Sequence, residues 1–231
     1  MIHNDLKGKC YIMTTLCGVC YGKFRPYTNN GGSLAAASGH DFTLLAADSQ
    51  LVHGMTIAST VFERTSALGN LAALGTSGCV ADCDSLSHDL RMEAERYFWG
   101  AEMSMEASVA AQVCSQMMYA RRAFPYYASL LLCGLDRFGT GRVCVFDSFG
   151  SITEGQMVAV GSAQGVLQAV LDRFAPRYFP RFRCIDDAKE VLLSAFKVAA
   201  RRDVSVGHFV DLTLVSRTEI LCDTVLIRAC D

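Results

Sequence analysis

The sequence predicts an α+β fold in which antiparallel sheets carry helices layered on their faces. Short apolar runs bounded by turn residues alternate with longer segments of helical period, in the order strands, two helices, strands, two helices, strands. Hairpin-linked strands form antiparallel sheets, and helices that come in pairs cover a sheet face instead of linking parallel strands. No repeat or linker divides residues 33–231, so we expect one domain there.

The first half of the chain begins with strands and changes to helices. Residues 1–30 have no sustained period and are predicted to form a leader ahead of the domain, which takes up residues 31–231. Glycine-containing turns at 39–41 and 69–70 separate strand-like runs. The predicted strands are Ser33–Ser38, Phe42–Ala47, Val61–Leu68 and Leu71–Gly75. The predicted helices are Asp82–Phe98, with Leu86, Leu90, Ala94 and Tyr97 on its apolar side, and Glu106–Arg122, with Val109, Val113, Met117 and Ala120 on its apolar side.

The second half repeats this order. Pro125 cannot continue a helix, so the second helix ends before it. The predicted elements that follow are the strands Ala128–Leu135 and Arg142–Phe146, the helices Ser162–Phe174 and Asp187–Arg201, and a closing hairpin of Phe209–Val215 and Ile220–Ile227.

Composition excludes several classes of protein. With 51% hydrophobic residues the chain is not disordered as a whole, and none of its apolar runs reaches the roughly 18–20 residues of a membrane-spanning helix. A formal net charge of −2 gives no general attraction to nucleic acid. Only 19% of the residues are charged, which leaves little polar surface and predicts an obligate assembly partner.

The cysteines and the N-terminus leave one alternative open. Lys7 and Lys9 precede an apolar stretch that resembles a weak secretory signal, although Cys17-Gly18-Val19-Cys20 dilutes it. Most of the 11 cysteines would be reduced and buried in the cytosol, but removal of residues 1–22 would leave an even eight, which suits a secreted protein. Cys17 and Cys20 have no second ligand pair, so no zinc site is predicted.

Two further segments have compositions that could bind a ligand. Residues 161–165 open a helix and could hold an anion, although a tight packing turn is the favoured interpretation. The segment from Arg173 to Arg183 interleaves arginine with aromatic residues, which suits stacking on single-stranded nucleic acid or a protein contact. The near-neutral charge of the chain favours the protein contact. No phosphate-binding glycine motif is present.

Several motifs between Phe24 and the C-terminus together resemble the proteasome beta subunits. They are Asn30–Leu34, Leu45–Ser49, Gly54, Tyr119–Tyr127, Gly134–Asp136, Phe146–Ser151, Gly161–Ala163, Leu171–Asp172 and Arg202–Val204. The Arg-Arg-x-Phe-Pro-Tyr-Tyr element at 121–127 resembles one type in particular, the beta-6 position of the ring, called beta type-1 in some schemes. The resemblance implies the N-terminal-nucleophile hydrolase fold, a four-layer αββα sandwich, which agrees with the element order.

The resemblance also implies a site without its nucleophile. Active members of the family expose an N-terminal Thr, whose hydroxyl attacks the peptide carbonyl while its own amine acts as base. Counting back from Asp48 places this residue at Gly31 if the turn at 39–41 carries one extra residue, and at Gly32 if it does not. Neither glycine has a hydroxyl, so no catalytic residue is expected in this chain.

The other family positions agree only in part. The resemblance places Asp48 at the aspartate near the nucleophile, and Ser162 and Asp203 at the residues that support the free amine. Arg64 takes the place of the lysine that lowers the pKa of the nucleophile, and Val206 that of a second serine. Arginine keeps the charge but loses the titratable amine. We therefore expect these residues to be scaffold contacts instead of catalysts.

The function implied is that of a structural, non-catalytic beta subunit of the 20S proteasome core. Such a subunit completes the ring, walls the proteolytic chamber and supports the substrate pocket of an active neighbour. The implied partners are beta-5 and beta-7 type neighbours, the opposite beta ring and an alpha ring, in cytoplasm and nucleus, without cofactor, metal, nucleic acid or membrane. Active neighbours would trim the leader. The alternatives are a peptidase that uses Ser33 and a nucleic-acid-binding module built on Arg173–Arg183.

Overall fold

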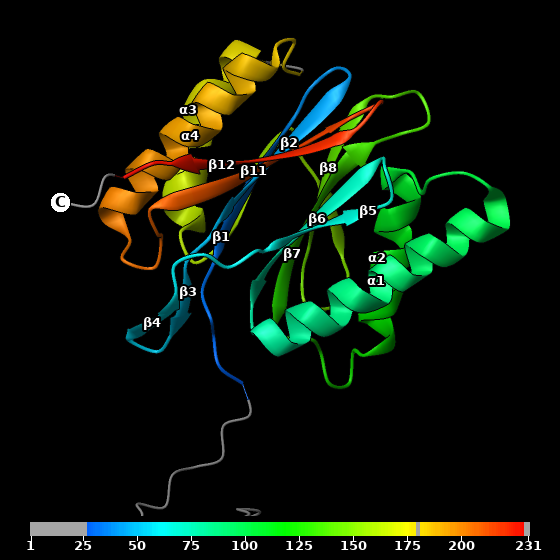
Figure 1. Ribbon diagram of the computed structural model, residues 1–231, viewed down its shortest axis with the longest axis horizontal. Coiled ribbons are helices and arrows are strands. Elements are labelled where there is room, and N and C mark those ends of the chain that lie inside the picture. Colours follow the sequence, from blue (N-terminus) through cyan, green and yellow to red (C-terminus); the bar gives the residue numbers. More distant parts are fainter. Residues whose placement is uncertain (1–26, 179–180, 229–231) are drawn as a thin grey trace, which may run out of the picture.

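The computed structural model describes residues 27–178 and 181–228. Within them, two five-stranded sheets lie face to face, and helices cover the outer face of each (Figure 1). The first sheet has the order β10 (Met157–Gly161), β1 (Ser33–Ser38), β2 (Phe42–Asp48), β11 (Phe209–Ser216) and β12 (Ile220–Leu226). The second has the order β5 (Thr65–Leu68), β6 (Ala72–Gly78), β7 (Ala128–Leu135), β8 (Gly141–Phe146) and β9 (Ile152–Glu154).

Each helix pair packs on its own sheet, so the predicted αββα sandwich is confirmed. Helices α1 (Val80–Ala101) and α2 (Ala107–Ala120) lie on the second sheet, and α3 (Gln164–Tyr178) and α4 (Ile185–Arg202) lie on the first (Figure 1). The strand pairs within both sheets are antiparallel. A separate short hairpin of β3 (Leu51–His53) and β4 (Thr56–Ser59) projects beside the start of β1 (Figure 1).

The inner strands are buried on both faces. Ala35 and Ala37 of β1 pack toward α3 and α4, while Leu34 and Ala36 belong to the apolar layer between the sheets. A third apolar layer joins α1 and α2 to the second sheet. Because both faces of β1 are apolar, its sequence shows no alternation of polar and apolar residues.

Several element boundaries differ from the prediction, and long-range contacts explain them. The sequence analysis missed β3, β4, β9 and β10, and β10 is held by pairing with β1, which lies far away in sequence. The predicted strand Val61–Leu68 is shorter, because residues 61–64 leave the sheet and carry Arg64 under the start of β1. Helix α1 starts two residues early, where the Val80 amide donates to the Asn30 side chain at 3.1 Å.

The buried face of α2 was also predicted wrongly. Val109, Val113 and Met117 are only partly buried. Small residues and Met118 face the core instead, because the helix lies close against β7 and β8; the fully buried positions are Ala107, Ala110, Ala111, Cys114 and Met118. Helix α1 was predicted better, since Leu86, Leu90 and Ala94 are buried.

The predicted contact loop at Arg173–Arg183 is largely a helix end. Arg173 and Phe174 belong to α3, while residues 179–180 lie outside the described residues. Phe182 is fully buried in the core under α3 and α4, and its carbonyl accepts the amide of His40 at 2.9 Å. An aromatic residue in the core cannot stack on a nucleic-acid base, so the observed burial removes one member of the predicted surface.

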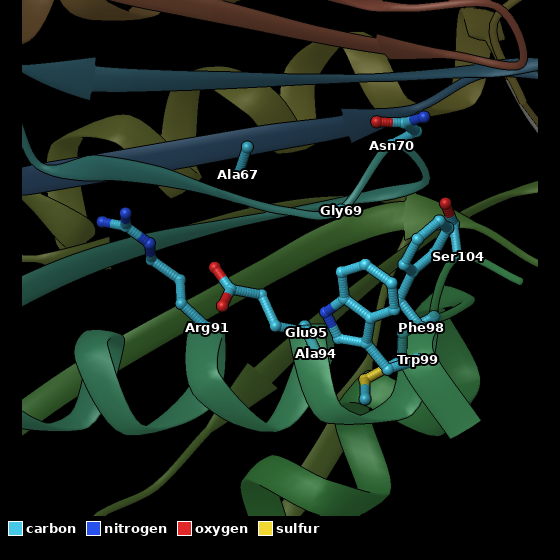
Figure 2. A pocket seen from close by; sticks show the side chains of 10 residues that line it. Ala67, Gly69, Asn70, Arg91, Ala94, Glu95, Phe98, Trp99 and Ser104 are labelled. Carbon is cyan, nitrogen blue, oxygen red and sulfur yellow. The ribbon is translucent and has the colours of Figure 1, made fainter. Parts of the chain in front are cut away.

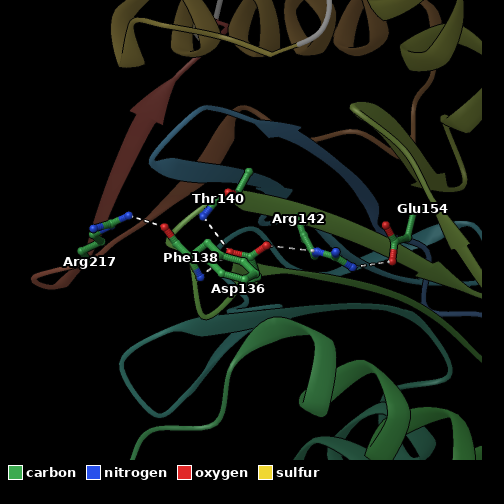
Figure 3. A network of polar contacts seen from close by, with 6 residues as sticks. All are labelled: Asp136, Phe138, Thr140, Arg142, Glu154 and Arg217. Carbon is green, nitrogen blue, oxygen red and sulfur yellow. Dashed lines mark hydrogen bonds and ion pairs between the residues drawn. The ribbon is translucent and has the colours of Figure 1, made fainter.

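Polar contacts tie the sheets together at one end (Figure 3). The Asp136 carboxylate accepts the amides of Phe138 and Thr140, each at 2.9 Å, and so closes the turn between β7 and β8. Arg142 bridges Asp136 and Glu154, with its Nη1 atom 3.0 Å from Glu154. Arg217, in the turn between β11 and β12, donates to the Phe138 carbonyl, so this contact links the two sheets.

Among the described residues, none of the helices is both long and apolar enough to cross a membrane. In the same residues, no group of three or more His, Cys, Asp or Glu side chains is arranged to hold a metal ion.

Candidate functional site

The segment that leads into β1 is held by hydrogen bonds from three other parts of the fold. Asn30 donates its amide to the Gly78 carbonyl at 2.9 Å and its side-chain Nδ2 to the Val52 carbonyl at 3.1 Å. Its Oδ1 atom accepts the amide of Val80, the first residue of α1, at 3.1 Å. These bonds fix the segment that enters β1 against β6, β3 and the start of α1.

Gly31 and Gly32 both have left-handed backbone angles, with φ of 69° and 98°. The Gly31 carbonyl accepts the Gly78 amide at 3.2 Å, and the Gly32 carbonyl accepts the Ser162 amide at 3.0 Å and the Ser77 hydroxyl at 2.8 Å. A Cβ atom on Gly32 would lie 2.5 Å from Cζ of Arg64, whereas one on Gly31 would meet Val52. Gly32 is therefore the glycine that lies against Arg64.

Arg64 is 4% exposed and donates to main-chain carbonyls instead of a carboxylate. Its Nε atom donates to the Asp48 carbonyl at 3.1 Å, and its Nη2 atom donates to Gln50 at 2.6 Å and to Asn30 at 3.2 Å. No ion pair with Arg64 occurs in the described part of the chain. Burial lowers the pKa of Arg64, and the neighbouring Asp48 acts in the opposite direction. The side chain thus serves as a clamp that joins the glycine segment to the end of β2.

A row of hydroxyl groups leads from the start of β1 to the loop after α4. Ser205 donates to the Asp203 carboxylate at 2.8 Å, and its oxygen lies 2.8 Å from that of Ser162, whose hydroxyl also donates to the Gly32 carbonyl at 3.3 Å. Ser162 in turn accepts from Ser33 at 3.1 Å, since each hydroxyl has one proton to donate. Ser33 is fully buried and also accepts the Ala163 amide at 3.1 Å. Its proton is committed to Ser162, and no lysine or histidine of the described residues hydrogen-bonds it.

Comparisons with known proteins identify the family of this chain. The family model described as "Proteasome subunit" matches residues 28–215. This chain belongs to the proteasome subunit family. It is 32% identical to "Proteasome subunit beta type-1" of Drosophila melanogaster over 91% of this chain and 93% of that protein. It is 32% identical to "Proteasome subunit beta type-1" of Danio rerio over 89% of each, and 26% identical to "Proteasome subunit beta type-6" of Saccharomyces cerevisiae over 84% and 87%.

The predicted resemblance to proteasome beta subunits is therefore confirmed. In this proteasome subunit the structure brings Asp48, Arg64, Ser162 and Asp203 around the glycine segment. The sequence analysis missed Ser205, although its position two residues after Asp203 is the spacing at which an aspartate binds a following amide and hydroxyl. It also missed Ser77 and Asn30, whose partners are distant in sequence.

Asp48 has an unusual environment in this proteasome subunit. Its Oδ1 atom accepts the amides of Gly207 at 2.9 Å and Gln50 at 3.1 Å, while the buried Oδ2 atom has no partner in the described residues. Burial raises the pKa of the Asp48 carboxyl to about 6, although both amides and Arg64 act against the rise. The carboxyl also faces Asp203, whose charge raises the pKa further. The folded protein therefore binds a proton at Asp48 more tightly than the unfolded chain does.

This raised pKa makes the stability of the chain depend on pH. The pKa of Asp48 in the folded protein lies above the ordinary value of 3.8, so the stability that protonated Asp48 contributes is complete below pH 3.8 and is lost as the pH rises through about 6. We expect a loss on the order of 2–3 kcal/mol across this range relative to Asp48→Asn, whose amide does not titrate. Urea unfolding of both proteins at a series of pH values measures this difference. A constant difference between pH 4 and 7 would contradict the assignment.

Proposed function

We propose that this chain is a structural, non-catalytic beta subunit of the 20S proteasome core, which completes the beta ring and walls the proteolytic chamber. One observation carries the proposal. Gly32, which has no hydroxyl, lies beside the buried cation Arg64. The nucleophile is thus absent from the position where the family's chemistry needs a hydroxyl and an amine on one residue. The names of the relatives, beta type-1 and beta type-6, favour the beta-6 position.

The proposal also covers the neighbours of the chain, its location in the cell and its role beside an active subunit. The neighbours are beta-5 and beta-7 type subunits, with an alpha ring on one face and the second beta ring on the other, in cytoplasm and nucleus. The chain supports the substrate pocket of an active neighbour and has no catalytic residue of its own. Because Gly32 cannot attack the preceding carbonyl, an active neighbour trims the leader.

We expect the cut to fall before Tyr27. The Tyr27 ring contacts Phe124 and Tyr127, with ring centroids 5.7 and 5.9 Å apart, and the Asn30 side chain accepts the Val80 amide of α1. A protease needs an extended, accessible segment, and residues from Tyr27 onward are tied down. The boundary at residue 30 predicted from the sequence is a different expectation, and sequencing of the mature N-terminus distinguishes it from a cut before Tyr27.

The first test is the native mass and composition of the particle that contains this chain. The tagged full chain is purified from its own cells, and its N-terminal peptide is sequenced in the same sample. We expect a large ring assembly with Thr-initiated subunits, and a mature N-terminus for this chain at or before Tyr27. A monomer or small oligomer would contradict the proposal.

The rival function, a peptidase that uses Ser33, predicts a different outcome for a single substitution. We expect particles that contain Ser33→Ala to hydrolyse peptides at the wild-type rate, because the Ser33 proton is held by Ser162. The matched control is Ser38→Ala, which removes another buried hydroxyl of β1, the one that donates to the Gln156 carbonyl at 3.2 Å. A loss of hydrolysis with Ser33→Ala alone would support the peptidase instead.

A further inference from the structure

Residues 27–30, which we call the arm, are fastened to the domain at two points. The first is Tyr27, whose ring centroid lies 5.7 Å from that of Phe124 and 5.9 Å from that of Tyr127. The second is Asn30, which hydrogen-bonds to β6, β3 and the start of α1. Among the described residues, Tyr27 is therefore the contact of the arm that lies nearest to the N-terminus.

The two residues between these points make no hydrogen bond that holds them to the domain. In the part of the chain that the structure describes, neither Thr28 nor Asn29 bonds to a residue outside this stretch. The Asn29 side chain accepts the Gly31 amide at 2.9 Å, two positions along the same segment. Release of Tyr27 therefore leaves Asn30 as the first residue that is hydrogen-bonded to the domain.

The surface under Tyr27 is a turn that the domain itself holds in place. It is the Arg-Arg-x-Phe-Pro-Tyr-Tyr element at 121–127, which follows α2. The Phe124 amide donates to the Arg121 carbonyl at 2.9 Å, and the Tyr127 amide donates to the carboxylate of Asp82 in α1 at 2.7 Å. The backbone that carries both rings is thus fixed, and the arm packs on a preformed surface.

We propose that the element at 121–127 sets the point at which trimming of the chain stops, because it holds Tyr27 out of reach of a protease. A protease cuts a segment that it can hold in extended form, and a docked residue must first come loose. Each cut adds one water across a peptide bond, so the removed fragment leaves with a carboxylate and the chain keeps a new amine. The docked ring preserves an arm that begins at or before Tyr27. This inference rests on the proposed function, in which an active neighbour trims the leader.

Phe124→Ala removes one of the two ring contacts and leaves the amino acids around the cut unchanged. A pair of aromatic rings changes a local equilibrium by about two- to tenfold. A protease that acts on the opened state cuts in proportion to the population of that state. We therefore expect cleavage between residues 27 and 30 to become about fivefold faster in this variant.

Limited proteolysis of the isolated full chain with proteinase K measures this change, and mass spectrometry identifies the new N-terminus of the domain. We expect the wild-type chain to be trimmed to an end at or before Tyr27, and Phe124→Ala to be trimmed further, to ends between Thr28 and Asn30. Phe124 is 69% exposed, so its loss leaves the core intact, which the melting temperature of the variant checks. Equal ends and equal rates in the two chains would overturn the proposal.

Two control variants separate the ring contact from a general loss of stability. Phe124→Tyr keeps a ring at this position, and we expect the wild-type pattern. Phe98→Ala removes another exposed phenylalanine, whose ring lies 5.9 Å from that of Trp99 at the opposite end of α1 (Figure 2). We again expect the wild-type pattern, because Phe98 does not contact the arm. Equal trimming of Phe98→Ala and Phe124→Ala would overturn the proposal.

The outcomes also separate this inference from the proposed function. A wild-type chain that enters no large particle contradicts the proposed function, whereas the digestion of the isolated chain still decides whether the ring contact protects the arm. In purified particles, we expect Phe124→Ala to begin up to about three residues later than the wild-type chain. A wild-type chain that begins beyond Tyr27, or a variant that begins at the same residue as the wild type, would overturn the proposal.

Discussion

Replacement of Arg64 with alanine is expected to lower the free energy of unfolding by about 3–5 kcal/mol. Arg64 donates to the carbonyls of Asp48, Gln50 and Asn30, and its guanidinium is buried against the glycine segment. Alanine leaves these buried acceptors without a charged donor and leaves a cavity beneath Gly32. Chemical unfolding of the isolated chain measures the loss.

Two matched variants separate the clamp from the charge. Arg64→Lys keeps the charge, but its single ammonium cannot copy the forked arrangement of Nε and Nη2, so we expect roughly half of the loss. Arg96→Ala removes an arginine whose side chain is 72% exposed and which contacts only Glu93 within its helix, so we expect a change below about 0.5 kcal/mol. If Arg64→Ala cost no more than Arg96→Ala, the clamp would have no structural role.

Gly32→Thr, which places a threonine at the nucleophile position of the family, is not expected to create peptidase activity. In Gly32→Thr the new Cβ atom would lie 2.5–2.7 Å from three atoms of the Arg64 guanidinium, and φ of 98° is strained for any residue with a side chain. Backbone strain and overpacking together should lower the free energy of unfolding by about 3–5 kcal/mol. We expect lower stability and no new peptide hydrolysis, measured by chemical unfolding and by peptide assays on particles that contain the variant.

Gly100→Ala is the control for this substitution. Gly100 lies within α1, and a Cβ atom there meets nothing within 4 Å. We therefore expect a gain of about 0.5–1 kcal/mol, because alanine is the better helix former. A Gly32→Thr chain as stable as wild type would show that the pocket around Arg64 relaxes easily, and new hydrolysis would show that only the hydroxyl was missing from the site.

The elements that could be predicted are those with strong local signals. β1 and β7 were predicted with their observed bounds, and α1 nearly so, because turn residues or a clear helical period delimit them. The short strands β3, β9 and β10 were missed, since a run of three to five residues has too little pattern of its own. β10 is held in place by its pairing with β1. The sheet on which α2 packs decides which side of that helix is buried.

The site was predictable in its residue types and not in its connections. The resemblance placed Asp48, Arg64, Ser162 and Asp203 at family positions from their order and spacing. It left the choice between Gly31 and Gly32 open, because one extra residue in a hairpin changes the count by one. Only the three-dimensional contact with Arg64 distinguishes the two glycines.

The sequence by itself determined the family and the layer order, because both depend on local pattern. The tertiary structure decided how the glycine segment before β1 is held. Arg64, Asn30 and the row from Ser33 to Asp203 are joined by hydrogen bonds between residues up to 130 positions apart. Hydrogen bonds depend on distance and direction in space, and neither is written in the order of the residues.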